Sequence, residues 1–344
     1  MKITHVNFAK GFRGGERQTQ LLIEQLATQG YQQILLARVG SDLAQRCKEI
    51  MNLSIREIPK PYIFHLNCSQ PTDLIHAHET KALQFAYVAS LLHKIPYIVT
   101  RRVDNPLKTN FLNTKMYRAA FRSVALSHAI EKEILRVSPN ANTEIIPSAY
   151  SDAKIDPTKA KKIKARFKDK FLVGNVGALV DSHKGQSFLI EAAKVLEQSH
   201  PDIHFILLGR GEDEAKFKAQ AKGLTNITFE GFVDNVNDYI SCFELFVFPS
   251  RHEGLGSILF DVMQLNVPII ATDVGGIPDI IQNGVNGILI PPLNKNAIID
   301  NVLSLYINPE KRASLAAYAS KNVTDYAPGN MAKRYRSLYS EVIS

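Results

Sequence analysis

Two carboxylates flank a glycine-rich turn in the C-terminal half of the sequence, at a spacing suited to ligand binding. Glu253 stands before the run 254–257 (Gly-Leu-Gly-Ser), and Asp261 follows with seven residues between the two acids. Glycines let a backbone approach a ligand, and free N–H groups at a helix start favour an anion. Carboxylates would repel a phosphate alone, but they accept hydrogen bonds from hydroxyls. The turn therefore predicts a ligand with both groups, as in a nucleotide sugar.

The segments around this turn must hold it in place. Residues 245–248 are apolar and β-prone, the residues from Ile258 onward follow helical spacing, and 268–271 is a buried-strand run. Asp261 then falls about one turn inside the helix. For either acid alone, a solvated surface position is the plain alternative. The placement of both between two strands of an alternating α/β half favours binding.

Two further loops are phosphate candidates. Gly14 and Gly15 lie in a glycine-rich loop between an expected strand at 3–8 and a helix, and Lys184 precedes a glycine at another helix start. Helix N-termini and lysines both favour phosphate groups. The first loop lacks the GxGxxG spacing, so a plain tight turn remains an alternative there. For Lys184 the alternative is a surface position.

A pair of histidines ends another expected strand, at residues 73–79. His76 and His78 point to the same side of it because side chains alternate along a strand. Histidines at this spacing can bind a metal ion, but no third ligand is near them in the sequence. We therefore expect no metal.

The segment 101–122 combines basic and aromatic residues. It carries one acid, Asp104, and interleaved apolar side chains such as Phe111 and Leu112. Such a mixture suits a surface helix on anionic lipid or a pocket for an acidic acceptor, whereas a solvated helix with an ordinary core face is the alternative. The six basic residues are Arg101, Arg102, Lys108, Lys115, Arg118 and Arg122.

Length and charge bound the class of protein. The 344 residues suggest two domains, and the net charge of +8 lies entirely in residues 1–150, with 19 Lys+Arg against 11 Asp+Glu. No nucleic-acid-binding motif accompanies this charge, so a membrane surface or a phosphorylated lipid acceptor suits it better. The polar N-terminus, the absence of a membrane-length apolar stretch and three scattered cysteines predict a cytoplasmic protein.

Strand and helix patterns alternate through both halves, which predicts an α/β protein with two Rossmann-like, doubly wound domains. We expect a first domain at 1–150, a connection within 147–170 and a second domain at 151–327. A final helix at about 328–344 is expected to pack back on the first domain.

From Pro249-Ser250 to Gly275-Gly276-Ile277-Pro278-Asp279 and Asn283-Gly284-Val285-Asn286-Gly287, the sequence resembles the retaining glycosyltransferases of family 4, which have the GT-B fold. The resemblance extends over essentially the whole chain. It implies that the two domains face each other across a cleft. It also implies transfer of a sugar, with retention at the anomeric carbon and without a metal or other cofactor, from a UDP-sugar or a GDP-sugar, with UDP favoured.

The same resemblance implies roles for individual residues. Glu253 would hold sugar hydroxyls, Lys184 would meet the diphosphate, and His78 would contact the donor sugar and shape the acceptor pocket. Asp261 would hold the ribose. The other donor-binding residues implied are Gly14, Gly15, Phe232, Val233, Gly254, Leu255, Gly256 and Ser257.

Two positions depart from the family pattern. The second acid of the motif is Asp261 in place of glutamate, and Ala178 stands where the family has an arginine. These departures keep a degenerate sugar-binding or scaffold protein open as an alternative, as well as a nucleotide-sugar epimerase. The resemblance otherwise points to lipopolysaccharide core or capsule synthesis, with a glycolipid or oligosaccharide acceptor at the inner face of the membrane.

Overall fold

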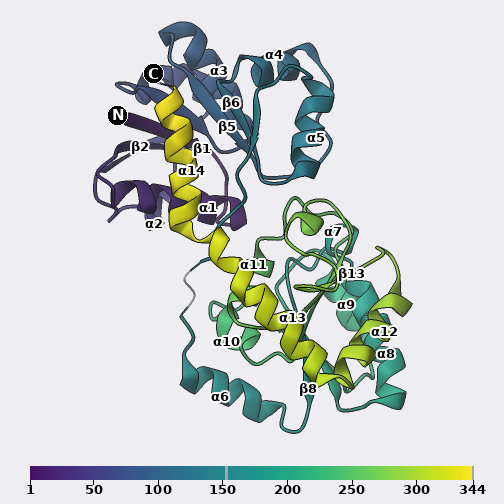
Figure 1. Ribbon diagram of the computed structural model, residues 1–344. Helices are drawn as coiled ribbons and strands as arrows, with labels where there is room; N and C mark the ends of the chain where they lie inside the picture. Colours follow the sequence, from purple (N-terminus) through teal and green to yellow (C-terminus); the bar gives the residue numbers. More distant parts are fainter. Residues whose placement is uncertain (152–153, 343–344) are drawn as a thin grey trace. The chain divides into compact units, whose positions relative to one another are not determined.

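The chain divides into two compact units. The computed structural model describes residues 1–151 and 154–342. Unit 1 is Met1–Ala149 together with the chain from Tyr326 onward, and unit 2 is Tyr150–Asp325 (Figure 1). Residues 152–153 of the expected connection and 343–344 of the expected final helix lie outside the described residues.

Unit 1 is built on a seven-stranded sheet with the order β3-β2-β1-β4-β5-β6-β7, in which every neighbouring pair is parallel. Parallel strands are covered on both faces, which is why they read as apolar runs in the sequence. The strands are β1 (Lys2–Asn7), β2 (Gln32–Arg38), β3 (Leu53–Ile58), β4 (Leu74–Ala77), β5 (Tyr97–Arg101), β6 (Arg122–Ala125) and β7 (Thr143–Ile145).

Helices connect these strands and cover the sheet. Glu79 caps α3, since its carboxylate accepts hydrogen bonds from the amides of Lys81 (2.7 Å) and Ala82 (2.8 Å). The helices of unit 1 are α1 (Gly14–Ala27), α2 (Asp42–Arg46), η1 (Tyr62–Ser69), α3 (Thr80–His93), α4 (Phe111–Ala119), α5 (His128–Val137) and α14 (Pro328–Glu341).

The C-terminal helix α14 belongs to unit 1 although α13 belongs to unit 2. Tyr335 and Tyr339 of α14 are buried in a core cluster that also contains Leu22 of α1 and Ile3 and Ile98 of the sheet. Figure 1 shows α14 beside α1 and β1. The last helix of the chain is therefore part of the hydrophobic core of the first unit.

Unit 2 has a six-stranded parallel sheet with the order β10-β9-β8-β11-β12-β13. The two parallel, helix-covered sheets confirm the predicted α/β class with two Rossmann-like domains. The strands are β8 (Phe171–Val176), β9 (Ile203–Leu208), β10 (Ile227–Gly231), β11 (Leu245–Phe248), β12 (Ile269–Thr272) and β13 (Ile288–Ile290).

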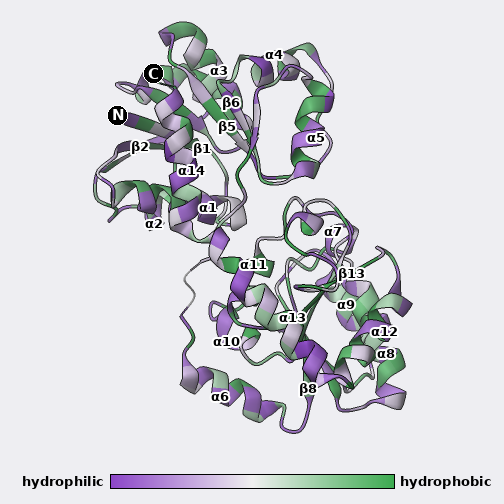
Figure 2. Ribbon diagram, in the orientation of Figure 1, coloured by the Kyte–Doolittle hydropathy of each residue, from purple (hydrophilic) through white to green (hydrophobic). Residues whose placement is uncertain are grey.

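The helices of unit 2 differ widely in polarity. α6 buries only Ile163 among its ten residues, and Figure 2 shows it as largely hydrophilic. No helix in the described part of the chain is long and apolar enough to cross a membrane. The helices are α6 (Pro157–Arg166), α7 (Asp181–Lys184), α8 (Gln186–Ser199), α9 (Glu214–Gln220), α10 (Val236–Ile240), α11 (Ile258–Gln264), η2 (Ile277–Asp279), α12 (Lys295–Tyr306), α13 (Pro309–Asn322) and η3 (Val323–Tyr326).

In each sheet there is one point, called the switch point, on either side of which successive strands are added in opposite directions. In unit 2 this switch point lies between β8 and β11, and in unit 1 it lies between β1 and β4. Ligands of doubly wound folds bind beside such points, at the carboxyl ends of the strands. The loops that follow these four strands are therefore the places to look for a site.

Candidate functional site

Lys184 and Glu253 flank the switch point of unit 2. Lys184 ends α7, which follows β8, and Glu253 lies in the loop after β11. The Lys184 ammonium donates to the Glu253 carboxylate, and both side chains are mostly buried. The structure thus brings together two residues that are far apart in the sequence and were both predicted to bind the donor.

Backbone hydrogen bonds hold the two loops against each other. The amides of Arg251 and His252 both donate to the carbonyl of His183, at 2.8 Å and 3.2 Å. The Arg251 guanidinium lies 2.8 Å from the Asp181 carboxylate. The Lys184–Glu253 pair therefore sits on a fixed frame.

Glycines allow the Glu253 loop to approach its neighbours. Gly275 has a φ of +55°, and a Cβ there would overlap the carbonyl oxygen of Glu253. The Gly276 amide donates to that carbonyl at 3.0 Å. On the other side, Gly185 has a φ of +63°, and a Cβ there would overlap the Pro249 carbonyl oxygen. Only glycine fits these close approaches.

The glycine-rich turn itself lies at the start of α11. Gly256 has a φ of +86°, Leu255 is buried, and Ser257 precedes the first helical residue. Gly254 lies directly after Glu253. The predicted turn and helix are therefore present, although α11 has only seven residues.

Asp261 is buried and already has a partner within unit 2. Its Oδ1 accepts hydrogen bonds from the amide of Ser151 at 3.2 Å and from the Ser151 hydroxyl at 3.1 Å. This contact could not be predicted from the local sequence pattern, because the two residues are 110 positions apart. Whether Asp261 also holds a ribose stays a prediction, and this oxygen would have to be shared or released.

Phe232 and Val233 follow β10, at the carboxyl edge of the same sheet. The Phe232 side chain is 66% exposed. The Gly209 amide donates to the carbonyl of Gly231 at 2.7 Å, which fixes the loop after β9 against this one. An exposed aromatic ring at this edge of the sheet suits a flat base. Ala178, which follows β8, has no charged side chain and cannot supply the positive charge of the arginine that the family has there.

Unit 1 places its predicted residues beside its own switch point. Gly14 and Gly15 begin α1 after β1, and His78 follows β4. A Cβ on Gly15 would lie 3.4 Å from the Cδ of Arg102, so the glycine loop, Arg102 and the histidine are neighbours.

His78 belongs to a chain of buried hydrogen bonds that the sequence did not reveal. Its Nε2 lies 3.0 Å from His5 Nδ1, and His5 Nε2 lies 3.1 Å from Gln33 Oε1. The Gln33 amide nitrogen donates to the Ile23 carbonyl at 3.0 Å. At the other end, Arg102 Nη2 lies 3.2 Å from His78 Nδ1.

These partners determine where the protons are. Gln33 offers its oxygen to His5, so His5 Nε2 carries a proton and Nδ1 accepts. Arg102 can only donate, so His78 Nδ1 accepts and its Nε2–H donates to His5. Both rings are therefore neutral. Burial lowers the pKa of His5 to about 4 and the pKa of His78 well below its usual value, in agreement.

His76 has a separate set of partners. Its Nδ1 lies 2.6 Å from the Tyr339 hydroxyl, and its Nε2 lies 2.7 Å from the Thr100 hydroxyl, which contacts Tyr335 at 3.0 Å. These contacts anchor α14 to the sheet. The ring of His76 lies against that of His78, with centroids 3.9 Å apart and planes tilted by 37°.

The three histidines His5, His76 and His78 lie close enough to hold a metal ion, with ligand atoms within 4.8 Å of one another. The expectation that no third ligand is near was wrong, because His5 pairs with His76 in the β1–β4 register. Yet a metal on His78 Nε2 would require a proton on Nδ1, facing the N–H of Arg102. Since two donors repel, this partner set fits a hydrogen-bond chain better than a metal site.

The six basic residues of 101–122 do not share one surface, which corrects the expectation of a single basic helix. Arg101 ends β5 and is buried, and Arg102 is partly buried against His78. Arg122 begins β6 and pairs with Glu341 at 2.5 Å. The exposed members are Lys108, Lys115 and Arg118.

The exposed members lie on and beside α4, next to apolar side chains. Phe111 is 75% exposed and Leu112 is 49% exposed. The Lys115 ammonium lies 4.2 Å from the centroid of the Phe111 ring. A smaller basic and aromatic patch thus remains.

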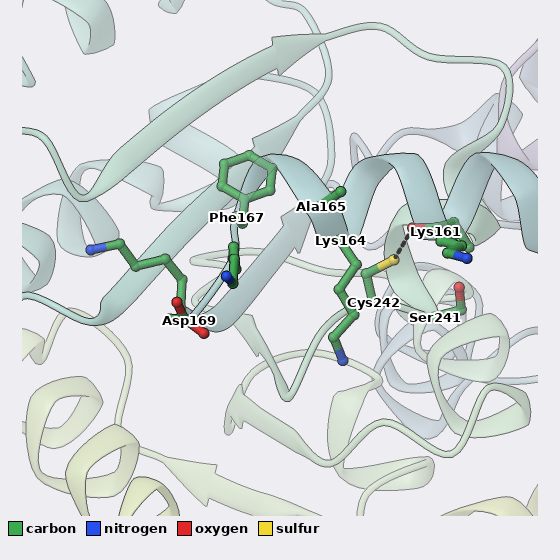
Figure 3. A pocket seen from close by; sticks show the side chains of 10 residues that line it. Lys161, Lys164, Ala165, Phe167, Asp169, Ser241 and Cys242 are labelled. Carbon is green, nitrogen blue, oxygen red and sulfur yellow. Dashed lines mark hydrogen bonds between the residues drawn. The ribbon is translucent and has the colours of Figure 1, made fainter.

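A cavity of about 630 Å³ lies elsewhere in unit 2 (Figure 3). It is lined by lysines of α6 and by Ser241 and Cys242, which precede β11, so it lies at the amino edge of the sheet. The Cys242 thiol donates to the carbonyl of Ala160, and burial raises its pKa. This cavity therefore lies at the opposite edge of the sheet from the loops at the switch point.

Comparisons with known proteins agree with the geometry. Residues 156–322 match the family model described as glycosyl transferases group 1. Over its whole length the chain resembles Anabaena HepE in complex with UDP and glucose, with a TM-score of 0.87, 18% identity, and coverage of 99% of this chain and 100% of that one. The fold is GT-B. The predicted fold is thereby confirmed, and residues 156–322 are similar to group 1 glycosyl transferases.

Two curated relatives are enzymes of sugar transfer. The chain is 32% identical to the alpha-D-kanosaminyltransferase of Streptomyces kanamyceticus over 241 residues, 67% of this chain and 62% of that protein. It is 28% identical to the putative teichuronic acid biosynthesis glycosyltransferase TuaC of Bacillus subtilis over 243 residues, 67% of this chain and 60% of that protein. The alignments thus span less than two thirds of these relatives.

Proposed function

We propose that this protein is a retaining glycosyltransferase of family 4 that moves a sugar from a UDP-sugar to a glycolipid or oligosaccharide acceptor. The observation that carries the proposal is the Lys184–Glu253 pair at the switch point of unit 2, which is similar to group 1 glycosyl transferases. One member suits a diphosphate and the other suits sugar hydroxyls, the two parts of a nucleotide sugar.

In this proposal the donor replaces the internal ion pair. The Lys184 ammonium turns to the departing diphosphate and stabilises its growing charge, together with the amides of residues 254–257. Glu253 then accepts hydrogen bonds from the sugar. Phe232 and Val233 hold the base. The UDP in the complex of Anabaena HepE supports UDP over GDP.

The reaction proposed needs no metal. Lys184 supplies the positive charge that a metal ion would otherwise bring to the diphosphate. The histidines near the unit 1 switch point are committed to a hydrogen-bond chain.

The acceptor is proposed to bind unit 1, which carries the excess of positive charge. The exposed patch on α4 combines Phe111 and Leu112 with lysines, a mixture that suits the surface of an anionic membrane. A role in lipopolysaccharide core, capsule or related surface-polysaccharide synthesis is consistent with the similarity to TuaC.

The test is sugar transfer by the purified full chain. UDP-sugars and GDP-sugars are offered with lipid extracts as acceptors, in the presence of a chelator, and release of the nucleoside diphosphate is followed. We expect release with a UDP-sugar that depends on the acceptor and an α-configured product from an α-configured donor. Conversion of the donor without any acceptor would instead indicate an epimerase, and binding without turnover would indicate a degenerate relative.

A further inference from the structure

Arg102 is a charged side chain without a counter-ion. In residues 1–151 and 154–342, no carboxylate lies within ion-pairing distance of its guanidinium. Its Nε is buried and has no hydrogen-bond partner. Glu16 is close enough to favour the charged guanidinium, but its carboxylate accepts from the Arg13 amide at 2.9 Å. A partly buried cation is costly unless an anion pairs with it.

The only polar partner of Arg102 in this part of the structure is a neutral histidine. His78 accepts one N–H of the guanidinium and brings no negative charge. The proton order along His78, His5 and Gln33 leaves His78 Nδ1 free to accept from Arg102. The row of hydrogen bonds therefore orients the Arg102 guanidinium without neutralising its charge.

The position of Arg102 is suited to an anionic ligand. Its side chain lies against Gly15, in the first turn of the 14-residue helix α1. Amides in that turn have no partner within the helix and favour an anion. A guanidinium fork matches the oxygens of a phosphoryl group.

We propose that Arg102 binds a phosphoryl group of the substrate held by unit 1, and that His78, His5 and Gln33 are positioning residues that aim its guanidinium. In this role His78 acts through Arg102 rather than by touching a sugar, because both of its ring nitrogens are engaged. The inference rests on the proposed function only for the source of the phosphoryl group, which is either a nucleoside diphosphate or a phosphorylated acceptor bound at unit 1.

Calorimetric titration of the full chain tests the binding step. The probes are UDP, glucose 6-phosphate and inorganic pyrophosphate, and the variants are Arg102→Gln and, as the matched control, Arg46→Gln at the exposed end of α2. We expect Arg102→Gln to weaken at least one probe tenfold or more and Arg46→Gln to weaken none. Weaker UDP binding assigns the phosphoryl group to a nucleotide, and weaker glucose 6-phosphate binding assigns it to the acceptor.

Two results would overturn the proposal. The first is that Arg102→Gln binds every probe with the same affinity as the wild type. The second is no binding of any probe by the wild type in the millimolar range. Lys184→Gln separates this failure from failure of the proposed function, because loss of UDP binding in that variant would support the donor site whatever Arg102 does.

The positioning chain has a spectroscopic signature. Nitrogen-15 spectra of the wild type at neutral pH should show His5 and His78 as neutral rings protonated on Nε2. Gln33→Leu should shift these signals and weaken the same probe as Arg102→Gln, although Gln33 touches no ligand. If either ring in the wild type were protonated on Nδ1, or on both nitrogens, the proposed hydrogen-bond arrangement would be contradicted. This result does not depend on a variant.

Discussion

Lys184 and Glu253 form an ion pair that joins the loop after β8 to the loop after β11. The pair keeps a cation and an anion together at the switch point of unit 2, where a donor with a negative diphosphate and neutral hydroxyls is proposed to separate them. Its two members can therefore be tested one at a time.

Removal of the Glu253 carboxylate should abolish turnover with little loss of stability. We expect Glu253→Ala to lower the rate at least about 100-fold, the scale seen when a charge-stabilising group is removed from an active site. The free energy of unfolding should change by about 1 kcal/mol, as for a single ion pair near the surface. Initial rates and urea unfolding measure the two effects. Glu310→Ala, at an exposed position of α13, is the control, and full activity of Glu253→Ala would contradict the assignment.

A side chain at position 275 should disturb the Glu253 loop. Gly275 and Gly284 both have positive φ angles, of +55° and +75°, but only at Gly275 would a Cβ meet the Glu253 carbonyl. We expect Gly284→Ala to cost about 1–2 kcal/mol from the left-handed backbone alone. Gly275→Ala should cost about 3 kcal/mol and reduce activity as well. If the two variants lost the same free energy of unfolding in urea, the close approach of Gly275 to the Glu253 carbonyl would not be important for stability.

The contact between Asp261 and Ser151 should contribute to the stability of unit 2. Asp261→Ala removes a buried acceptor from both the amide and the hydroxyl of Ser151, at a cost of about 2–3 kcal/mol. Asp261→Asn keeps an acceptor oxygen and should retain most of the stability. Thermal and urea unfolding of the two variants compare them directly. If both lost the same amount, the hydrogen bonds to Ser151 would not be the cause.

The buried histidines should make unit 1 sensitive to acid. Burial lowers the pKa of His5 from 6.5 to about 4, so between these values the unfolded chain binds a proton that the folded chain does not. Stability is then full above pH 6.5 and falls as the pH is lowered, by about 3 kcal/mol at pH 4 from this residue. His76 and His78 act in the same direction. Urea unfolding at several pH values measures this dependence. The free energy of unfolding should fall less steeply with decreasing pH in His5→Gln than in the wild type, and an equal dependence on pH in the two proteins would refute the prediction.

The exposed basic residues on and beside α4 should control attachment to anionic lipid. Changing Lys108, Lys115 and Arg118 together to Ser should weaken binding to vesicles that contain phosphatidylglycerol, by about 1 kcal/mol per residue at low salt. Sedimentation of the protein with vesicles measures this. A variant of unit 2 with Lys216, Lys311 and Lys321 all changed to Ser removes the same three charges and is the control for net charge. Unchanged sedimentation of the triple variant would return α4 to an ordinary solvated helix.

The sequence predicted the parts of the fold that depend on local pattern. The strands expected at 245–248 and 268–271 correspond to β11 and β12, because strands covered on both faces are continuous apolar runs. Edge strand β3 was not predicted, since its half-buried residues alternate with charged ones. The acid spacing around the glycine turn likewise led to the loop that carries Glu253.

Contacts between distant segments could not be predicted in this way. His5 lies beside His76 only because β1 pairs with β4, and that register is a property of the folded sheet. Arg101 and Arg102 looked like surface residues in a basic run, but Arg101 is the last residue of β5 and is buried, and Arg102 directly after it is partly buried. The local pattern reveals which residues can do chemistry, and the tertiary structure decides which of them meet.

Thermal unfolding of the full chain with a panel of UDP- and GDP-sugars, without added metal, tests the central claim most directly. A ligand that binds only the folded protein stabilises it by mass action, by about 2.7 kcal/mol at a hundred times its dissociation constant. The account predicts a selective rise in the midpoint with UDP-sugars, which is lost in Lys184→Gln. No shift with any nucleotide would contradict a donor site in unit 2.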